Sequence, residues 1–305
     1  MNGKLQFASD YMEGAHPAIV GRLQETNLLK TAGYGLDEFS ESAREKIRKS
    51  CEAPEADVFF LVGGTQTNAT VIDAFLKPWQ GVVAAETGHI AVHEAGAVEY
   101  TGHKVLTLPQ HLGKMDAGEL EAISGVCRQY GIPLYIDGAR LAYALACPEN
   151  DVTLPDLARL CDAFYIGGTK CGTLFGEAVV FPRRDTVPHF FTIVKQHGAL
   201  LAKGRIAGIQ FDTLFTDGLY ETIGKNAIEN ADRIRAALRE KGYHQPFEAP
   251  TNQIFVTLSR QQAKDLSENI EMSFWENADQ DHVVMRIVTS WATQKEEADS
   301  LIACL

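Results

Sequence analysis

The sequence predicts an α/β protein with a mostly parallel central sheet, flanked by helices and followed by a smaller C-terminal α+β unit. Short apolar runs alternate with longer helical patterns from about residue 55 to residue 182. These runs are continuously apolar, which is typical of strands covered on both faces. The chain has 305 residues, enough for two domains. We expect a large domain over residues 16–219 and a small one over 220–305, with residues 1–15 near the functional site.

The large domain is expected to contain six strands joined by helical crossovers. The apolar runs lie at 58–62, 82–85, 105–108, 134–136, 163–166 and 178–181. Helical patterns at 68–76, 120–130 and 154–161 are long enough to connect parallel strands. The second of these ends at Gly131 and Pro133, two residues that commonly stop a helix.

The last third of the chain predicts a different arrangement. Residues 225–241 form a helical pattern that Gly242 ends. Three strand patterns follow, at 254–258, 272–275 and 283–288, and a helical pattern at 293–304 closes the chain. We therefore expect a small antiparallel sheet packed against terminal helices.

Charge and cysteine usage limit the class of partner. The chain has 28 Lys and Arg against 40 Asp and Glu, a net charge of −12, which repels nucleic-acid phosphates and anionic lipids. Its six cysteines form no CxxC pair, and no secretory leader or membrane-length apolar run of about 20 residues is found. The sequence predicts a cytoplasmic protein with neither a nucleic-acid nor a membrane partner.

A glycine-rich turn follows the first predicted strand. Ligands of open α/β sheets bind beyond the carboxyl ends of the strands. Residues 63–68 read Gly-Gly-Thr-Gln-Thr-Asn and lead into a helix, so glycine backbone, free N–H groups and a hydroxyl could hold one phosphate. Taken alone, the run is better explained as an ordinary turn with a threonine cap. It lacks the spacing of the dinucleotide and nucleoside triphosphate motifs.

Three further strand ends carry polar side chains. His89 follows the second strand, Asp137 and Arg140 follow the fourth, and Lys170 follows the fifth within glycine-rich backbone. Each has a structural alternative: a hydrogen-bonding histidine, a helix cap with a surface arginine, and a solvated loop lysine. The glycines around Lys170 indicate a bulky group packed against that backbone.

Considered together, these four positions predict pyridoxal 5'-phosphate. Its aldehyde needs a lysine, its ring nitrogen needs an acid, and its phosphate suits a helix terminus. A metal fits less well, because the only histidine pair at helical spacing, His89 and His93, lacks the glutamate of HExxH. A serine hydrolase is disfavoured because no GxSxG motif occurs.

The sequence resembles, nearly end to end, the threonine aldolase and β-eliminating lyase family of fold-type-I pyridoxal phosphate enzymes. Residues 63–68 resemble the family's phosphate turn, 88–90 its ring-stacking histidine segment, 136–140 its pyridinium acid with a carboxylate-binding arginine, and 169–170 its Schiff-base lysine. The resemblance implies that the cofactor is bound by Gly64, Thr65, Gln66, His89, Asp137 and Lys170, of which His89, Asp137 and Lys170 are catalytic.

Weaker matches imply further roles. Ser9 and Arg286, with Arg140, would bind the substrate carboxylate, and Arg205 would reach the phosphate of a neighbouring subunit, with Lys203 a competitor for that role. The family builds its sites between subunits, which implies a homodimer or homotetramer. Arg286 lies in an apolar strand pattern, where a charge needs an anionic partner. That partner is either the substrate or an acid of the chain.

One departure from the family concerns residues 114–120. The family has a further strand and a histidine-bearing loop there, whereas here the chain runs directly into the next helix. Either the strand is lost or the printed sequence lacks a segment. We favour the second explanation, because deleting an inner strand would leave its neighbours unpaired.

The resemblance implies an aldolase that acts on β-hydroxy-α-amino acids, cleaving threonine or allo-threonine to glycine and acetaldehyde. Lys170 would hold the cofactor, Asp137 would keep the ring nitrogen protonated, His89 would stack on the ring, and the arginines would orient the substrate. Two alternatives stay open. The same groups suit a β-eliminating lyase or an aminotransferase, and a non-catalytic pyridoxal phosphate binding protein would also contain them.

Overall fold

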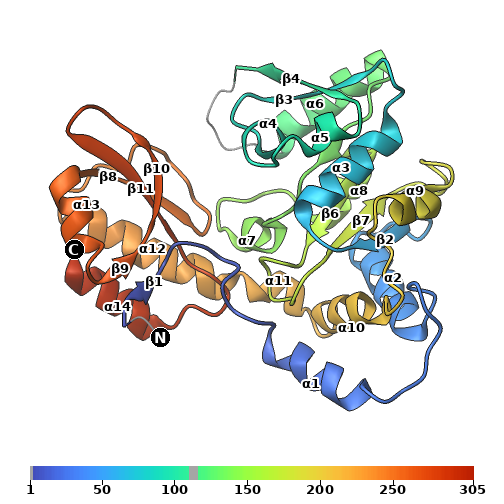
Figure 1. Cartoon of the computed structure of the whole chain (residues 1–305), viewed down its shortest axis with the longest axis horizontal. Helices are drawn as coiled ribbons and strands as arrows, with labels where there is room; N and C mark the ends of the chain where they lie inside the picture. Colours follow the sequence, from blue (N-terminus) through green and yellow to red (C-terminus); the bar gives the residue numbers. More distant parts are fainter. Residues whose placement is uncertain (1–2, 110–115) are drawn as a thin grey trace.

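The computed structural model describes residues 3–109 and 116–305, which form a larger and a smaller packed part (Figure 1). The strands of the larger part are β2 (Asp57–Leu61), β3 (Gly81–Ala85), β4 (Lys104–Leu108), β5 (Tyr135–Ile136), β6 (Ala163–Gly167) and β7 (Glu177–Phe181). Its helices are α1 (Pro17–Thr26), α2 (Glu38–Ser50), α3 (Gly64–Phe75), α4 (His89–Val92), α5 (Ala97–Tyr100), α6 (Ala117–Tyr130), α7 (Leu141–Ala146), α8 (Leu154–Leu160), α9 (Phe190–Gln196), α10 (Arg205–Leu214) and α11 (Leu219–Ile223).

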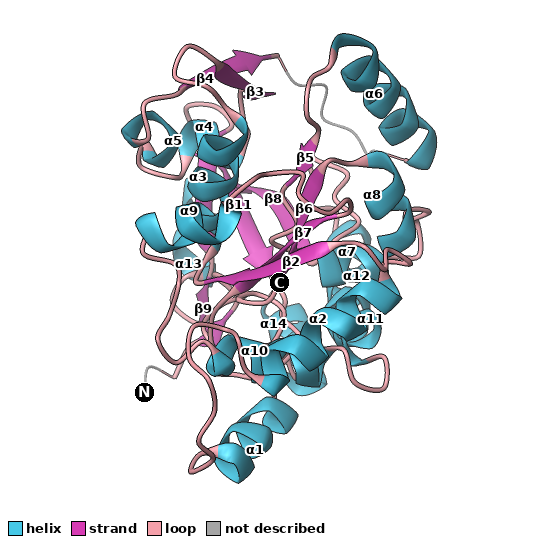
Figure 2. Cartoon of the chain, turned by 90° about the vertical axis from the view of Figure 1, so that its right-hand side faces the viewer, coloured by secondary structure: helices cyan, strands magenta, loops and turns pink. Residues whose placement is uncertain are grey.

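The central sheet has the order β2-β7-β6-β5 and helices on both faces (Figure 2). In β6, Phe164 and Ile166 join a core with helices α2, α7 and α8, while Ala163 and Tyr165 join a second core with α3 and α9. The predicted α/β fold is therefore confirmed. The sheet is mixed, however, because β5 and β6 are parallel whereas β7 runs antiparallel to both β2 and β6.

Strands β3 and β4 form a separate parallel pair that is not hydrogen-bonded to β5. The side chains of Val83 and Leu106 in this pair are exposed, unlike the fully buried residues of β6 and β7. The prediction that the strands are covered on both faces is therefore wrong for β3 and β4. The junction before α6 includes residues 110–115, which lie outside the described residues. Two unconnected sheets are the arrangement expected of a chain without an inner strand between β3 and β5.

The smaller part is an antiparallel sheet with helices on one side. It contains β1 (Leu5–Gln6), α12 (Lys225–Glu240), β8 (Gln253–Ser259), α13 (Arg260–Leu266), β9 (Ile270–Glu271), β10 (Ser273–Asn277), β11 (His282–Val288) and α14 (Lys295–Cys304). The strand order is β10-β11-β8. The N-terminal segment belongs to this part, because β1 pairs with β9 and Phe7 is buried in the same core as α12 and α14.

Helix α12 joins the two parts. Its residues Ala227 and Ile228 pack in the core of the larger part, whereas Ala231, Ile234 and Leu238 pack in the core of the smaller part. Helix α12 therefore links the core of the larger part to the core of the smaller part.

Local capping explains where two helices begin. Helix α6 starts at Ala117, three residues before its first predicted residue, because Asp116 and Glu119 form a reciprocal capping box. Thr153 and Asp156 cap α8 in the same way. None of the described helices combines the length and the apolar character needed to cross a membrane.

Candidate active site

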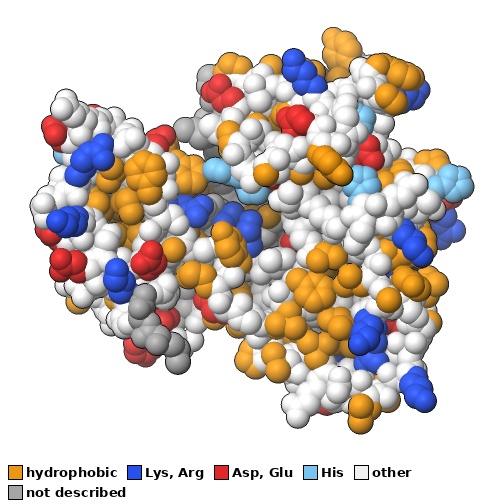
Figure 3. Space-filling view, in the orientation of Figure 1, with side chains coloured by type: hydrophobic (Ala, Val, Ile, Leu, Met, Phe, Trp, Pro, Cys, Tyr) orange, Lys and Arg blue, Asp and Glu red, His pale blue; other side chains and the backbone are white. Residues whose placement is uncertain are grey.

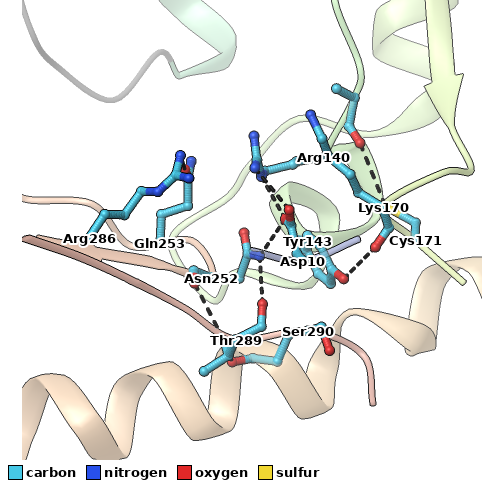
Figure 4. Close-up of polar contacts among 12 residues, drawn as sticks. Asp10, Arg140, Tyr143, Lys170, Cys171, Asn252, Gln253, Arg286, Thr289 and Ser290 are labelled. Atoms are coloured by element: carbon cyan, nitrogen blue, oxygen red, sulfur yellow. Dashed lines mark hydrogen bonds and ion pairs between the residues drawn. The ribbon is translucent and has the colours of Figure 1, made fainter. Parts of the chain in front are cut away.

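The strand ends singled out by the sequence meet at one edge of the central sheet, facing the smaller part. The parallel strands β5 and β6 end there at Asp137 and near Lys170, and α3 begins at the same edge after β2. The surface is hollowed between the two parts, with Lys and Arg side chains inside the hollow and histidine at its rim (Figure 3). Figure 4 shows the charged ends of Arg140, Lys170 and Arg286 turned toward this space.

The turn before α3 has the features of a phosphate cradle. Its N-cap, Gly63, supplies no side-chain cap, and the first turn of α3 contains no acid, so the N–H groups of this turn are available to an anion. A Cβ atom on Gly64 would lie 3.3 Å from the Tyr165 hydroxyl, which makes the lack of a side chain useful there. The Gln66 side chain instead bonds the backbone, accepting from the Val62 N–H (3.3 Å) and donating to the His197 carbonyl (2.9 Å). Gln66 can therefore contribute only its backbone.

Asp137 is exposed to the hollow and held in one orientation by three donors. The Tyr165 hydroxyl (2.5 Å) and the Ala139 N–H (3.0 Å) donate to Oδ1. The Asn68 side-chain amide donates to Oδ2 (2.9 Å). A carboxylate fixed in this way can receive the protonated nitrogen of an aromatic ring.

A buried chain of hydrogen bonds connects Asp137 to His89. The Asn68 amide donates to Oε1 of Glu94 (2.7 Å), and the same oxygen lies 2.7 Å from Nδ1 of His89. The Tyr135 hydroxyl donates to Oδ1 of Asn68 (2.8 Å), so a flipped amide would place its oxygen against two carboxylates. Glu94 is fully buried, while 47% of the His89 side chain is exposed. One nitrogen of His89 is therefore anchored, and its ring can cover a ligand.

Lys170 is half-buried and follows β6 after Gly168 and Thr169. Burial, together with the positive charge of Arg140, lowers the pKa of its amine. A lowered pKa increases the fraction of neutral amine that can attack an aldehyde. The Tyr143 hydroxyl donates to the Lys170 carbonyl (2.6 Å) and fixes the backbone at this position.

Glu177 lies behind the lysine loop and is buried. It accepts a hydrogen bond from the Gly168 N–H (2.9 Å), two residues before Lys170. Burial raises the pKa of its carboxyl to about 7. The loop that presents Lys170 is therefore held by an acid that changes charge near neutral pH.

Arg286 extends from β11 into the hollow and lacks a carboxylate partner. No acid lies within 4.0 Å of its guanidinium among the described residues, and its Nε atom is buried without a hydrogen-bond partner. Its contacts are weak: Nη1 donates to the Gln253 side chain (3.2 Å), and the guanidinium carbon lies 5.5 Å from the centre of the Trp275 ring. Burial and the nearby charge of Arg140 lower the pKa of Arg286.

The hydroxyl of Ser9 is likewise buried without a partner. Ser9 follows Ala8, whose carbonyl oxygen lies 3.5 Å from Nη2 of Arg286. The segment that contains Ser9 therefore lies beside Arg286, and a shared role in binding the substrate carboxylate stays a prediction. Two unsatisfied groups at one position indicate an absent polar ligand.

Arg140, in contrast, is already paired. Its Nε and Nη2 atoms donate to the two oxygens of Asp10 at 2.7 and 2.9 Å. Asp10 is buried and accepts a further hydrogen bond from Asn252 (2.9 Å). Only one terminal nitrogen of Arg140, Nη1, is left for a ligand within the part of the chain that the structure describes.

Arg205 does not join this site within one chain. Its guanidinium donates to the carbonyl oxygens of Thr26 and Leu29 and stacks on Phe39 at 5.5 Å. It therefore lies with α1 and α2, and its reach to a neighbouring subunit stays a prediction, as does the competing role of Lys203.

These residues fit pyridoxal phosphate. A glycine cradle, a fixed acid, a half-buried lysine and an anchored imidazole surround one space, and unsatisfied buried atoms of Ser9, Glu94 and Arg286 belong to the same region. Across residues 3–109 and 116–305, no group of three or more His, Cys, Asp or Glu side chains is placed to hold a metal ion.

Sequence reasoning gave no role to several residues that shape the site. Asp10, Asn68, Glu94 and Tyr165 contact predicted site residues, and Glu177 accepts a hydrogen bond from the Gly168 N–H in the loop of Lys170. Their only signal in the sequence is polarity inside or beside apolar runs, as at Glu177 before Ala178. Such a signal does not reveal a partner tens of residues away.

Comparison with known proteins agrees with this geometry. The family model for beta-eliminating lyases matches residues 6–124 and 116–261. The threonine aldolase structure from Leishmania major is 37% identical, covers 98% of this chain and 97% of that chain, and superposes with a TM-score of 0.95. The low specificity L-threonine aldolase of a Pseudomonas species is 27% identical over 295 residues, 83% of this chain and 84% of that protein.

More distant structures share the fold. A putative L-allo-threonine aldolase from Listeria monocytogenes is 17% identical, with coverage of 99% and 95% and a TM-score of 0.75. The serine palmitoyltransferase of Sphingomonas wittichii is 12% identical, with coverage of 99% and 86% and a TM-score of 0.71. The chain therefore belongs to the beta-eliminating lyase family and is a pyridoxal phosphate-dependent lyase of fold type I.

Proposed function

We propose that this protein cleaves β-hydroxy-α-amino acids, converting threonine or allo-threonine to glycine and acetaldehyde. The observation that carries the proposal is Arg286, a partly buried cation that has no acid of its own and faces the same hollow as Lys170 and Asp137. A substrate carboxylate is the partner that such a group lacks. The aldolases among the similar proteins support the choice of β-hydroxy substrates.

The bound cofactor supplies an electron sink for the bond that breaks at Cα. Residues of the chain would bind and orient the cofactor. Lys170 would hold the cofactor through its amine, and the backbone of Gly64, Thr65 and Gln66 would bind the phosphate. Asp137 holds the proton of the ring nitrogen, and His89 covers the ring while Glu94 keeps its imidazole in place.

Substrate orientation selects the bond that is cleaved. Arg286 and Ser9 bind the carboxylate from the side of the smaller part, and Nη1 of Arg140 approaches it from the larger part. Fixing the carboxylate would hold the substrate in one orientation, so that the Cα–Cβ bond and not another bond at Cα is the one presented for cleavage. This alignment favours loss of the β-carbon over loss of the α-proton.

We further infer a homodimer or homotetramer in which Arg205 of one subunit reaches the phosphate bound by its neighbour. Its position on α10, outside the hollow of its own chain, supports that role. The proposed domains are residues 16–219 for cofactor binding and 220–305 for the smaller unit, with Tyr220 and Ile223 of α11 packed in the core of the larger part.

Product analysis of the holoenzyme tests the proposed function. Threonine, allo-threonine, phenylserine and cysteine are supplied separately, and glycine, aldehydes, ammonia and pyruvate are measured. Glycine and an aldehyde in equal amounts are expected from the hydroxy substrates. Pyruvate from cysteine as the main activity would identify a β-eliminating lyase instead, and a cofactor absorbance without any turnover would identify a binding protein.

A further inference from the structure

We propose that His93 is the base that takes the proton from the β-hydroxyl of the substrate. This inference rests on the proposed aldol cleavage, which requires such a base for the departing aldehyde. It assigns a catalytic role to a residue that neither the sequence analysis nor the comparisons single out.

His93 lies between His89 of the larger part and Trp275 of the smaller part, with ring contacts to both. It ends the short helix α4 that begins at His89, and the spacing of four residues places the two rings on one face, 5.5 Å apart. The larger part of the molecule therefore presents two imidazoles to the hollow. The first is anchored to Glu94, and the second lies one turn farther along.

Across the hollow, His93 faces the carboxylate-binding side. Its ring centre lies 6.4 Å from that of Trp275 in β10, and the Arg286 guanidinium carbon lies 5.5 Å from the same indole centre. The imidazole and the guanidinium are therefore at most about 12 Å apart. A short β-hydroxy amino acid spans that distance with its carboxylate on Arg286 and its hydroxyl on His93, allowing for a hydrogen bond of about 3 Å at each end.

The nitrogens of His93 are available for chemistry. The ring is exposed and makes ring contacts with His89 and Trp275, and no hydrogen bond to its nitrogens occurs among the described residues. The neighbouring His89 has one nitrogen committed to Glu94. His16 uses Nδ1 to cap α1 by accepting from the Ala18 N–H (3.3 Å). Among the described residues, His93 is thus the imidazole at this face whose nitrogens are both without a hydrogen bond.

The step is a balanced proton transfer. An imidazole nitrogen of His93 takes the hydroxyl proton, and the electron pair of the broken O–H bond becomes the second carbon–oxygen bond of the aldehyde. The Cα–Cβ electron pair stays with the glycine fragment. That fragment then gains one proton at Cα, so the proton lost from the hydroxyl is replaced at carbon.

The test uses the holoenzyme with His93→Phe, which keeps an aromatic ring beside Trp275 but has no basic nitrogen, and with His93→Gln. His244→Phe is the matched control, because His244 is exposed and lies in the smaller part, outside the site. Threonine cleavage is measured together with exchange of the α-hydrogen of glycine in deuterated water. The exchange reaction needs the cofactor and Lys170 but no hydroxyl base.

We expect both His93 variants to lose about 10² to 10⁴ in kcat for cleavage. Glycine exchange and the cofactor absorbance should stay within about twofold of the His244→Phe control. Near-control cleavage would overturn the proposal, and so would a parallel loss of glycine exchange, because His93 would then act on a step common to both reactions. Absence of cleavage in the unmodified holoenzyme would instead refute the proposed function itself.

Discussion

Two arginines face each other across the hollow, and they differ in what balances their charge. Arg140, on the larger part, is bound by both oxygens of the buried Asp10. Among the described residues, Arg286, on the smaller part, has polar contacts with an amide, a carbonyl and a hydroxyl but with no carboxylate, and it lies over the indole face of Trp275. A charge that the fold already neutralises is mainly structural, whereas one left unpaired is kept for a ligand.

The Arg140–Asp10 pair connects segments that are distant in sequence. Asp10 belongs to the N-terminal segment, Asn252 precedes β8, and Arg140 follows β5. The pair therefore ties the N-terminal segment and the smaller part to the edge of the central sheet. The same link places the segment of Ser9 beside Arg286, so the paired Arg140 supports the unpaired Arg286 while its own Nη1 stays available to the substrate.

The largest expected effect on activity is that of replacing Lys170, which faces the hollow together with Arg140 and Arg286 (Figure 4). Lys170→Ala should abolish turnover and the absorbance of the bound cofactor, because no other lysine follows a strand in a comparable glycine frame. Absorbance spectra and borohydride trapping of the cofactor provide the measurement. A trapped adduct on the Ala variant would show that the reaction centre is not between the two arginines.

The next effect tests the unpaired arginine. Arg286→Ala should raise KM for threonine by about 30- to 1000-fold, corresponding to about 2 to 4 kcal/mol for a charged hydrogen bond. The cofactor absorbance and the melting temperature should change little. Arg286→Lys is the matched variant and should recover part of the affinity. An unchanged KM with a melting temperature lowered by several degrees would make Arg286 a structural residue.

For Arg140, which is paired with Asp10, we expect a loss of stability where Arg286 gives a loss of substrate affinity. Asp10→Asn leaves the Arg140 charge without its carboxylate and should lower the melting temperature by about 5 °C or more. Thermal unfolding at equal cofactor loading measures this, with Arg286→Ala as the comparison. If the two variants unfold at the same temperature, the distinction between a structural and a substrate-binding arginine fails.

The smallest expected effect concerns Glu177, a buried acid that has no cation paired with it among the described residues and no ligand assigned to it. It is neutral when it binds a proton. Burial raises the pKa of Glu177 from 4.5 to about 7, so between these values the folded protein holds a proton that the unfolded chain has released. Stability should therefore fall as the pH rises through this range. Relative to the unmodified protein, Glu177→Gln should gain up to about 3 kcal/mol between about pH 5 and about pH 8.

Denaturant unfolding at the two pH values measures the difference. If Glu177→Gln and the unmodified protein differ in unfolding free energy by the same amount at both pH values, then Glu177 stays charged, stabilised by the positive charge of Lys170. In that case an ion pair, like that between Arg140 and Asp10, would stabilise the loop of Lys170, and a neutral acid would not.

Most elements could be predicted from sequence because their signals are local. Continuous apolar runs predicted β6 and β7, and the helical pattern from Lys225 predicted α12 within one residue of its end. The antiparallel direction of β7 could not be predicted, since an apolar run has no direction. The separation of β3 and β4 from the central sheet also depends on pairing between distant strands.

The site residues also fall into those with a local sequence signal and those that depend on contacts between distant segments. The sequence by itself determined the groups that depend on local backbone: the glycine turn that opens α3, and Asp137 and Lys170 directly after their strands. Only the tertiary structure decided which charges are paired, because Asp10 and Arg140 are 130 residues apart and Arg286 comes from the other part of the molecule. Burial makes these choices decisive, since a charge removed from water must find a partner, a proton or a ligand, and each of these is set by what the fold places beside it.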